Sequence, residues 1–220
     1  MKNILIIGSS GHAKVVIDII EKESKYQILG LLSRDQAAGE KVFDYEILGK
    51  QEELGTLLKE HTVNGIFVAV GDNFMRSKVS NFLAENHPQL EIISTIHPSA
   101  IIGRDVNIGK GTVIMAGAVI NPSSSIGDFC IINTNASLDH DCIMGDFSSL
   151  APGVITGGDC QIGEYSAIGI GATLLHGIQI GKETVIGANS LVNKNIPPSN
   201  IAYGIPAKVI RKREAGEKYL

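Results

Sequence analysis

The chain has 220 residues, 44% of them hydrophobic and 19% charged, which is enough for one large or two modest globular domains. Its net charge of -4 excludes the basic footprint that nucleic-acid binding usually leaves. The apolar run at residues 4–7 is too short to span a membrane, and no secretory cleavage pattern follows it. With only three Cys, these features predict a cytoplasmic protein without a disulfide framework.

Residues 1–95 alternate between strand and helix patterns. The first predicted helix carries an apolar face at Val15, Ile19 and Ile20. Strands alternating with helices predict a parallel sheet covered by helices, and hence an α/β Rossmann-like domain over residues 1–95. The expected strands cover 3–8, 26–33, 65–71 and 91–96, and the expected helices cover 12–23, 51–61 and 73–86.

A glycine-containing turn, "GSSGHAK" at residues 8–14, follows the first strand and opens the first helix. The N–H groups at the start of a helix bind phosphate, so this context favours an anion site. The glycine spacing is not that of the dinucleotide fingerprint, and Ser33 and Arg34 stand where that fingerprint has an acidic residue. A plain strand-to-helix turn is the alternative interpretation.

From Ala100 onward an aliphatic residue recurs every six positions. Starting at Ile102, fifteen of the sixteen positions of this column are apolar, and Thr156 is the exception. Small residues mostly stand two positions before each aliphatic, and Gly often follows it. A fixed period of six is typical of a parallel β-helix built from hexapeptide repeats, with the aliphatic side chains pointing inward.

This half of the chain resembles the left-handed β-helix acyltransferases, in which three hexapeptides make one triangular coil. The resemblance implies the left hand and about five coils, and "GIPAK" at 204–208 resembles the C-terminal segment of that superfamily. We therefore predict a β-helix acetyltransferase domain with a C-terminal cap over residues 96–220. Cys130, Cys142 and Cys160 all fall on the small-residue position, which favours packing over a nucleophilic or metal-binding role.

The sequence "SLDHDC" at 137–142 places a charged group within the repeat. Residues 18 apart stack in neighbouring coils, so His140 and His176 should lie roughly 10 Å apart on one edge, with Gly158 between them. Three interpretations are open: a polar corner, a zinc site, or an acyl-transfer centre. The zinc site would resemble γ-class carbonic anhydrases, but Gly181 stands where that family has its third His.

Acyl transfer needs a base, a group that orients it, and N–H donors for the oxyanion. His140 can be the base, oriented by Asp141 or, less favourably, by Asp139. The Gly158 N–H can donate to the thioester oxygen, and the non-apolar Thr156 marks a local change in the coil next to His140.

The ordered motifs "IIGSSGHAKVV", "VAVGDNFMRSKV", "TIHPSAIIG" and "NTNASLDHDCIMGDFSSLAPGV" resemble the PglD/NeuD family of bacterial sugar N- and O-acetyltransferases over essentially the full length. The resemblance implies His140 as general base, Asp141 as its orienting group and Gly158 as oxyanion donor. The residues it implies for the nucleotide-linked sugar are Gly8, Ser9, Ser10, Gly11, His12, Ser33, Arg34, Gly71, Asp72 and Asn73.

The same resemblance implies acetyl-CoA as co-substrate, no metal, and a homotrimer with its active sites between subunits. Expected contacts with the cofactor are Ser149, Gly158, Ile170, Ala188 and Lys208. We therefore predict N-acetylation of a nucleotide-linked amino sugar by direct transfer. The alternatives are O-acetylation of sialic acid or another sugar hydroxyl, a metal-dependent hydratase, and a non-catalytic sugar-nucleotide binder.

Overall fold

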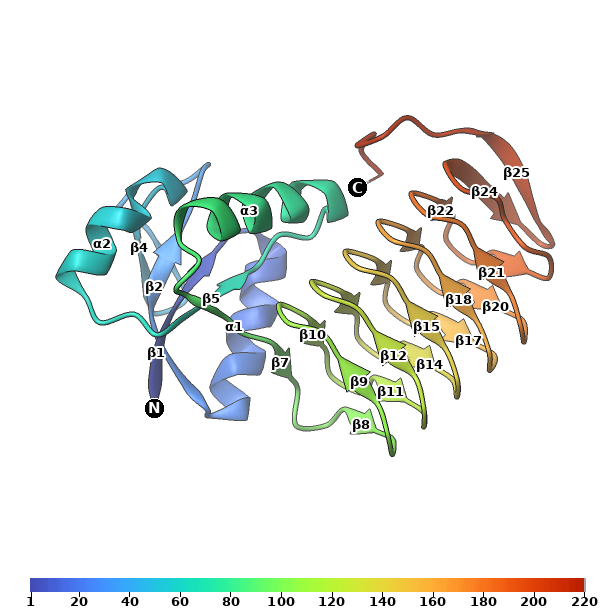
Figure 1. Cartoon of the computed structure of the whole chain (residues 1–220), viewed down its shortest axis with the longest axis horizontal. Coiled ribbons are helices and arrows are strands. Elements are labelled where there is room, and N and C mark those ends of the chain that lie inside the picture. The colour runs from blue at the N-terminus through green and yellow to red at the C-terminus, as the bar shows by residue number, and fades with distance from the viewer. Residues whose placement is uncertain (220) are drawn as a thin grey trace.

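The computed structural model describes residues 1–219, and it shows an α/β domain followed by a long parallel β-helix (Figure 1). The α/β sheet has the strand order β3-β4-β2-β1-β5-β6, and only the β3–β4 pair is antiparallel. Its strands are β1 (Lys2–Ile7), β2 (Tyr26–Leu32), β3 (Lys41–Val42), β4 (Tyr45–Gly49), β5 (Gly65–Val68) and β6 (Glu91–Ile92). The helices are α1 (Gly11–Glu23), η1 (Gln51–Glu53), α2 (Leu54–Glu60) and α3 (Asn73–Asn86).

Helix α1 lies between the α/β sheet and the β-helix. Its side chains Val16, Ile17 and Ile20 share one core with strands β1 and β2 and with Val113 and Ile131 of the β-helix. Val15 is 40% exposed, contrary to the prediction that it belongs to the buried face of this helix. The reason is that Val15 points into a cavity beside the β-helix instead of into the core.

Two segments of the α/β domain differ from the prediction. Strands β3 and β4 form a hairpin, and β4 adds to the sheet beside β2, in a stretch where we expected no strand. The predicted strand at 91–96 is divided: β6 completes the α/β sheet, whereas β7 (Thr95–Ile96) already pairs with β10 (Val113–Ile114) of the β-helix. The chain therefore passes from one sheet to the other within this segment.

The β-helix has three parallel sheets. The facing sheet, which lies toward the α/β domain, holds β7, β10, β13 (Ile131–Ile132), β16 (Ser149–Leu150), β19 (Ala167–Ile168) and β22 (Val185–Ile186). The second sheet holds β8 (Ile101–Ile102), β11 (Val119–Ile120), β14 (Ser137–Leu138), β17 (Ile155–Thr156), β20 (Thr173–Leu174) and β23 (Leu191–Val192). The third sheet holds β9 (Asn107–Ile108), β12 (Ser125–Ile126), β15 (Ile143–Met144), β18 (Gln161–Ile162) and β21 (Gln179–Ile180).

Partners in each sheet are 18 residues apart, as for Ser149 and Ala167, so the predicted coil length is confirmed. The aliphatic column fills the interior together with the small residues, including the free cysteines Cys130, Cys142 and Cys160. Because the interior is buried and apolar and the strands pair with the coils above and below, each coil depends on its neighbours for stability.

The three corners of the triangle have different surroundings. The pocket corner joins the facing sheet to the second sheet, at 133–136, 151–154, 169–172 and 187–190. The histidine corner joins the second sheet to the third, at 139–142, 157–160 and 175–178. The aromatic corner joins the third sheet back to the facing sheet and carries a stack of Phe129, Phe147 and Tyr165, with ring centroids 5.1 Å apart.

The hairpin β24 (Asn200–Gly204) and β25 (Ala207–Lys212) extends the facing sheet at its end. Beyond it, residues 213–219 turn back along the β-helix toward the start of α3 (Figure 1). Within residues 1–219, none of the helices combines the length and apolarity that crossing a bilayer requires.

Candidate active site

The histidine corner is built around the segment 139–141. The Asp139 N–H donates to Thr156 Oγ1 at 3.0 Å, which explains why a polar residue interrupts the aliphatic column. Asp139 Oδ1 accepts hydrogen bonds from Asn121 Nδ2 at 2.7 Å and from the His140 N–H at 2.8 Å. These bonds, that from Asn121 above all, lower the pKa of Asp139. Asp139 thus fixes the backbone of the corner and does not contact the imidazole.

The imidazole of His140 is held by the carboxylate of Asp141, the residue that follows it. Asp141 Oδ2 lies 2.8 Å from His140 Nδ1, and this hydrogen bond raises the pKa of His140. A carboxylate on Nδ1 selects the tautomer that leaves Nε2 as the proton acceptor. Both side chains are more than half exposed, so a substrate can reach this Nε2 from solvent.

Gly158 creates the space in which the ring of His140 lies. A Cβ atom at position 158 would come within 2.5 Å of both Cε1 and Nε2 of His140. The rings of His140 and His176 approach to 6.2 Å between centroids, closer than the predicted 10 Å, because that prediction measured the backbone and the His140 ring leans over the glycine. Among the described residues the Gly158 N–H has no acceptor, so it can bind an oxyanion.

Three or more His, Cys, Asp or Glu side chains do not come together in residues 1–219 in a group that could hold a metal ion. His140 and His176 form only a pair, and Gly181 offers no third imidazole. A catalytic zinc site typically requires three protein ligands and an open position.

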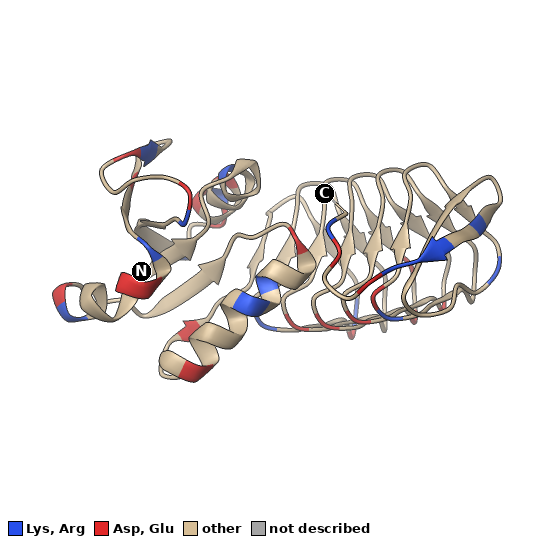
Figure 2. Ribbon diagram, turned by 90° about the horizontal axis from the view of Figure 1, so that it is seen from above, with Lys and Arg blue, Asp and Glu red and all other residues tan. Residues whose placement is uncertain are grey.

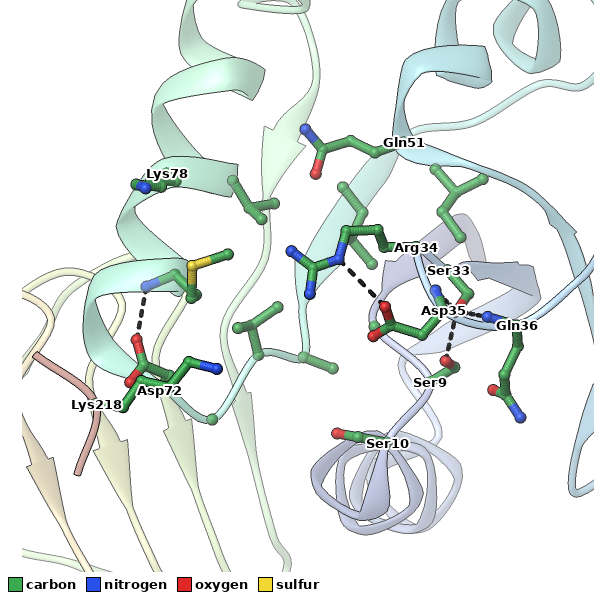
Figure 3. Close-up of a pocket in the computed structure, with 18 residues that line it drawn as sticks. Ser9, Ser10, Ser33, Arg34, Asp35, Gln36, Gln51, Asp72, Lys78 and Lys218 are labelled. Carbon is green, nitrogen blue, oxygen red and sulfur yellow. Dashed lines mark hydrogen bonds and ion pairs between the residues drawn. The ribbon is translucent and has the colours of Figure 1, made fainter. Parts of the chain in front are cut away.

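A cavity of about 680 Å³ lies at the carboxyl ends of β1, β2 and β5, where the predicted sugar-nucleotide residues converge (Figure 3). Ser10, the residue before α1, lines it, and its side chain makes no capping hydrogen bond. In parallel α/β sheets, ligands bind outside the carboxyl ends of the strands. Of the predicted residues, the cavity is lined by Gly8, Ser9, Ser10, Ser33, Arg34, Gly71 and Asp72.

Several of these predicted residues make hydrogen bonds that hold the local structure. Ser33 is buried, and its hydroxyl bonds the Ser9 hydroxyl at 2.7 Å and accepts the N–H of Gln36 at 3.0 Å. Asp72 caps α3 by accepting the N–H of Met75. Asn73 is buried, and its side-chain amide already bonds Ser149, Ser166 and Arg76, so its contact with the sugar stays a prediction.

A second cavity, of about 520 Å³, lies along the pocket corner between α1 and the β-helix. Gly11, His12 and Gly71 line it from the α/β domain, and Ser149, Ile170 and Ala188 from the β-helix, so predicted sugar and cofactor residues meet here. His12 Nε2 is buried without a hydrogen-bond partner, and burial lowers the pKa of His12 to about 4. His12 is therefore neutral at pH 7.

Lys208 lies elsewhere. It is exposed on β25, opposite Tyr203 in the hairpin, and borders neither of these two cavities. The turn of that hairpin begins at Gly204, which continues the line of Ile170 and Ala188 along the pocket corner, since Ala202 pairs with Ile186. Lys208 thus comes directly after the hairpin turn that ends this line of residues.

The structure does not bring all the predicted catalytic and cofactor residues together within one chain. His140 and Gly158 are on the histidine corner, whereas Ile170 and Ala188 are on the pocket corner. A six-residue side of the triangle separates the two corners, a path of up to roughly 20 Å. Within one chain, a thioester beside His140 would therefore lie at a different corner from Ile170 and Ala188.

Arg76 is a functional candidate that the sequence did not indicate. It is buried, and its guanidinium donates to the carbonyl oxygens of Val70 and Gly71 beside the cavity and of Phe129 and Phe147 on the aromatic corner. These bonds join the 70–73 loop to the β-helix. No pattern in "NFMRSK" distinguishes this arginine from a solvated one.

Comparison with known proteins places the fold and the site in a family. Residues 3–83 match the PglD N-terminal domain, and residues 159–194 match the bacterial transferase hexapeptide (six repeats). The chain is 34% identical to a histidine-to-asparagine mutant of perosamine N-acetyltransferase from Caulobacter crescentus, solved with CoA and GDP-perosamine. That match covers 96% of this chain and 98% of the other, with a TM-score of 0.90.

Two further relatives agree. The acetyltransferase domain of PglB from Neisseria gonorrhoeae FA1090, solved with acetyl coenzyme A, is 31% identical, with a TM-score of 0.86 over 95% of this chain and 99% of that chain. UDP-N-acetylbacillosamine N-acetyltransferase of Bacillus subtilis (strain 168) is 34% identical over 122 residues. This match spans 53% of our chain and 52% of that protein, about half the length of the curated relative.

The α/β domain followed by a hexapeptide β-helix defines a class of acetyltransferases, and the comparisons confirm both the left-handed β-helix and the use of acetyl-CoA by this class. Within that class, the chain belongs to the PglD-like family of sugar acetyltransferases, as the sequence predicted. Of the predicted activities, the relatives support N-acetylation of a nucleotide-linked amino sugar over O-acetylation.

Proposed function

We propose that this chain transfers the acetyl group of acetyl-CoA directly to the amino group of a nucleotide-linked amino sugar, with His140 as the general base. The observation that carries this proposal is the geometry of the histidine corner. Asp141 occupies Nδ1 of the imidazole, which leaves Nε2 free over Gly158 and open to solvent. The location in the cytoplasm remains a prediction from the sequence.

The reaction needs no covalent enzyme intermediate. The sugar nitrogen attacks the thioester carbonyl carbon while His140 Nε2 takes the proton from that nitrogen. The Gly158 N–H donates to the oxygen that becomes negative in the tetrahedral intermediate. The C–S bond then breaks, the CoA thiolate takes up a proton that His140 can supply, and the N-acetyl sugar remains. Asp141 stabilises the imidazolium that forms between the two steps.

In this proposal, two copies of the chain together form each active site. The histidine corner supplies the base and the oxyanion donor, and the pocket corner of a neighbouring copy supplies Ile170 and Ala188 for acetyl-CoA. The separation of the two corners within one chain supports this arrangement. A homotrimer closes it, since each copy then offers both corners. Lys208, beyond Ala188, would attract the CoA phosphates.

The two parts of the chain divide the work. Residues 1–95 bind the nucleotide through the cavity at the start of α1, and residues 96–220 hold acetyl-CoA and perform the transfer. Gly8, Ser9 and Ser10 would offer backbone and hydroxyl groups to the phosphates, with Arg34 beside them. Ser33 would act indirectly, by holding Ser9.

The test is an incubation with acetyl-CoA and a panel of UDP-, dTDP- and GDP-linked amino sugars, with CoA release as the readout. We expect turnover with at least one amino sugar and a loss of about 10² or more in kcat/KM for His140→Ala. His176→Ala is the matched control, with a loss below about tenfold. A loss in His140→Ala of less than tenfold would show that the base is another group.

The same assay distinguishes the alternatives. Turnover only with a sugar hydroxyl would indicate O-acetylation, and binding without turnover would indicate a sugar-nucleotide binding module. An equal loss in His140→Ala and His176→Ala, together with chelator sensitivity reversed by Zn²⁺, would indicate the metal enzyme. Mixing His140→Ala with Ala188→Trp, each inactive alone, should restore part of the activity if the site is shared between copies.

A further inference from the structure

Residues 213–219 return from β25 to the α/β domain, as both ribbon views show (Figures 1 and 2). The contacts at their far end are with α3. The Asn73 N–H donates to Tyr219 Oη at 3.1 Å, and a Cβ on Gly216 would come within 2.7 Å of the Phe74 ring. Gly216 also has a φ of +72°, which glycine tolerates best. The segment is therefore fitted closely to the start of α3.

The path of this segment is fixed by two arginines. Arg211 forms a two-pronged ion pair with Glu217, and this pair lowers the pKa of Glu217 to about 2, so the pair persists at neutral pH. Arg213 is buried, donates to the carbonyl oxygens of Glu183 and Glu217, and stacks on the Tyr219 ring at 5.2 Å. Bidentate arginine contacts of this kind give geometric precision.

Between Glu217 and Tyr219, which hold the segment in place, Lys218 faces the cavity of about 680 Å³ in the α/β domain. Lys218 lines that cavity together with Lys78 of α3, and Arg34 reaches it from the opposite wall (Figure 3). Arg34 is paired with Asp35 at 3.2 Å. Within residues 1–219, Lys78 and Lys218 have no carboxylate within 4.0 Å, although Asp72 also borders the cavity. The Lys78 ammonium lies 4.8 Å from the centroid of the Phe74 ring, so its partner is an aromatic face and not a carboxylate. Two lysines thus line one cavity without a counter-ion among residues 1–219.

We propose that Lys218, assisted by Lys78, binds the diphosphate of the nucleotide-linked sugar and so makes the 213–219 segment part of the substrate site. The inference rests on the proposed function in taking a nucleotide sugar as the ligand. The cavity has the size of a small-molecule site, and Gly8, Ser9 and Ser10, which precede α1, line it together with these lysines. A diphosphate carries the negative charges that would neutralise these two lysines.

Acetyl-CoA also carries phosphates, so the same cations could serve the cofactor. The position of Lys218 argues against this, because it lines the cavity of the α/β domain and not the one that Ile170 and Ala188 line. The experiment must still separate the two phosphate sources. Calorimetric titrations of the full chain with UDP, GDP, dTDP and CoA do this directly.

We expect Lys218→Gln to weaken the tightest of the three nucleoside diphosphates about fivefold and to raise KM for the amino sugar in parallel, with CoA affinity unchanged. The slope of log Kd against log salt should also become shallower, as loss of a phosphate contact requires. Lys218→Arg should restore most of the affinity. Lys212→Gln, an exposed lysine on β25, is the matched control and should match wild type.

Two results would overturn the inference: unchanged diphosphate affinity in Lys218→Gln, or weaker CoA binding with unchanged diphosphate binding. Failure of wild-type protein to bind any of the three diphosphates would overturn it as well. Failure of the proposed function looks different. In that case diphosphate binding still depends on Lys218, but no amino sugar is acetylated.

Discussion

The covered side of the β-helix and its open histidine corner are built from the same hexapeptide repeat. The covered side comprises the facing sheet with its pocket and aromatic corners, against which α1, α3 and the 213–219 segment pack. The histidine corner carries an imidazole and a carboxylate that are more than half exposed. The comparison teaches that the repeat supplies equivalent positions, and that the neighbouring elements decide whether a position anchors the fold or performs chemistry.

Arg76→Met should give the largest effect, because it removes the anchor of the covered side. Four carbonyl oxygens lose their guanidinium partner, which should lower the free energy of unfolding by about 3 kcal/mol. Urea titration at one fixed protein concentration measures this. Arg34→Met, at an exposed arginine paired only with its neighbour Asp35, should cost less than about 0.5 kcal/mol. Equal effects would show that the anchor is dispensable.

Gly158→Ala tests the open corner. The added methyl group occupies the space of the His140 ring, so we expect kcat/KM to fall about 10²-fold with little change in Tm. The φ of Gly158 is not in the left-handed region, which makes the backbone compatible with Ala. Gly55→Ala in α2, where a Cβ would contact only His87 at 3.6 Å, is the control. Retained activity in Gly158→Ala would contradict the assignment of His140.

Asp141→Asn tests how the open corner sets the protonation of its base. Asp141 raises the pKa of His140, and a general base must be neutral, so the wild-type rate rises with pH only as His140 loses its proton. The variant should show this rise at lower pH and a plateau at least about tenfold lower, because the imidazole loses its orientation. The kcat/KM profile between pH 5 and 9, on one fixed substrate, is the measurement. An unshifted profile would mean that another group sets the rise.

Thr156→Val should give the smallest effect, about 1 kcal/mol in the free energy of unfolding. The isosteric change removes the acceptor of the Asp139 N–H while the aliphatic column stays filled. Thr173→Val is the control, since within residues 1–219 the Thr173 hydroxyl makes no hydrogen bond. If the two variants unfold alike, Thr156 is simply a tolerated member of the column.

Much of the β-helix was predictable because residues that stack in space stand a fixed number of positions apart in the sequence. The period of six located the aliphatic column, the cysteines and the alignment of His140 with Gly158 and His176. The distance between the two rings was not predictable, because it depends on how side chains lean into the space above a glycine. The register gives backbone positions, and rotamers follow from the neighbours in space.

The α/β domain was less predictable from its sequence than the β-helix. Its alternation of strands and helices was readable, but the β3–β4 hairpin and the division of residues 91–96 between two sheets were not. Asn73 matched a family motif and is nevertheless buried, because its amide bonds the β-helix. Such contacts join residues far apart in sequence, and no local pattern records them.

The sequence by itself determined the two kinds of fold, the family and the position of the imidazole on one edge of the solenoid, because each follows from local periodicity or from an ordered motif. Only the tertiary structure decided that Asp141 and not Asp139 holds His140, that Arg76 joins the two domains, and that Lys218 lines the cavity at the carboxyl ends of β1, β2 and β5. These depend on long-range packing, which sets the distances between groups that the chain itself keeps apart.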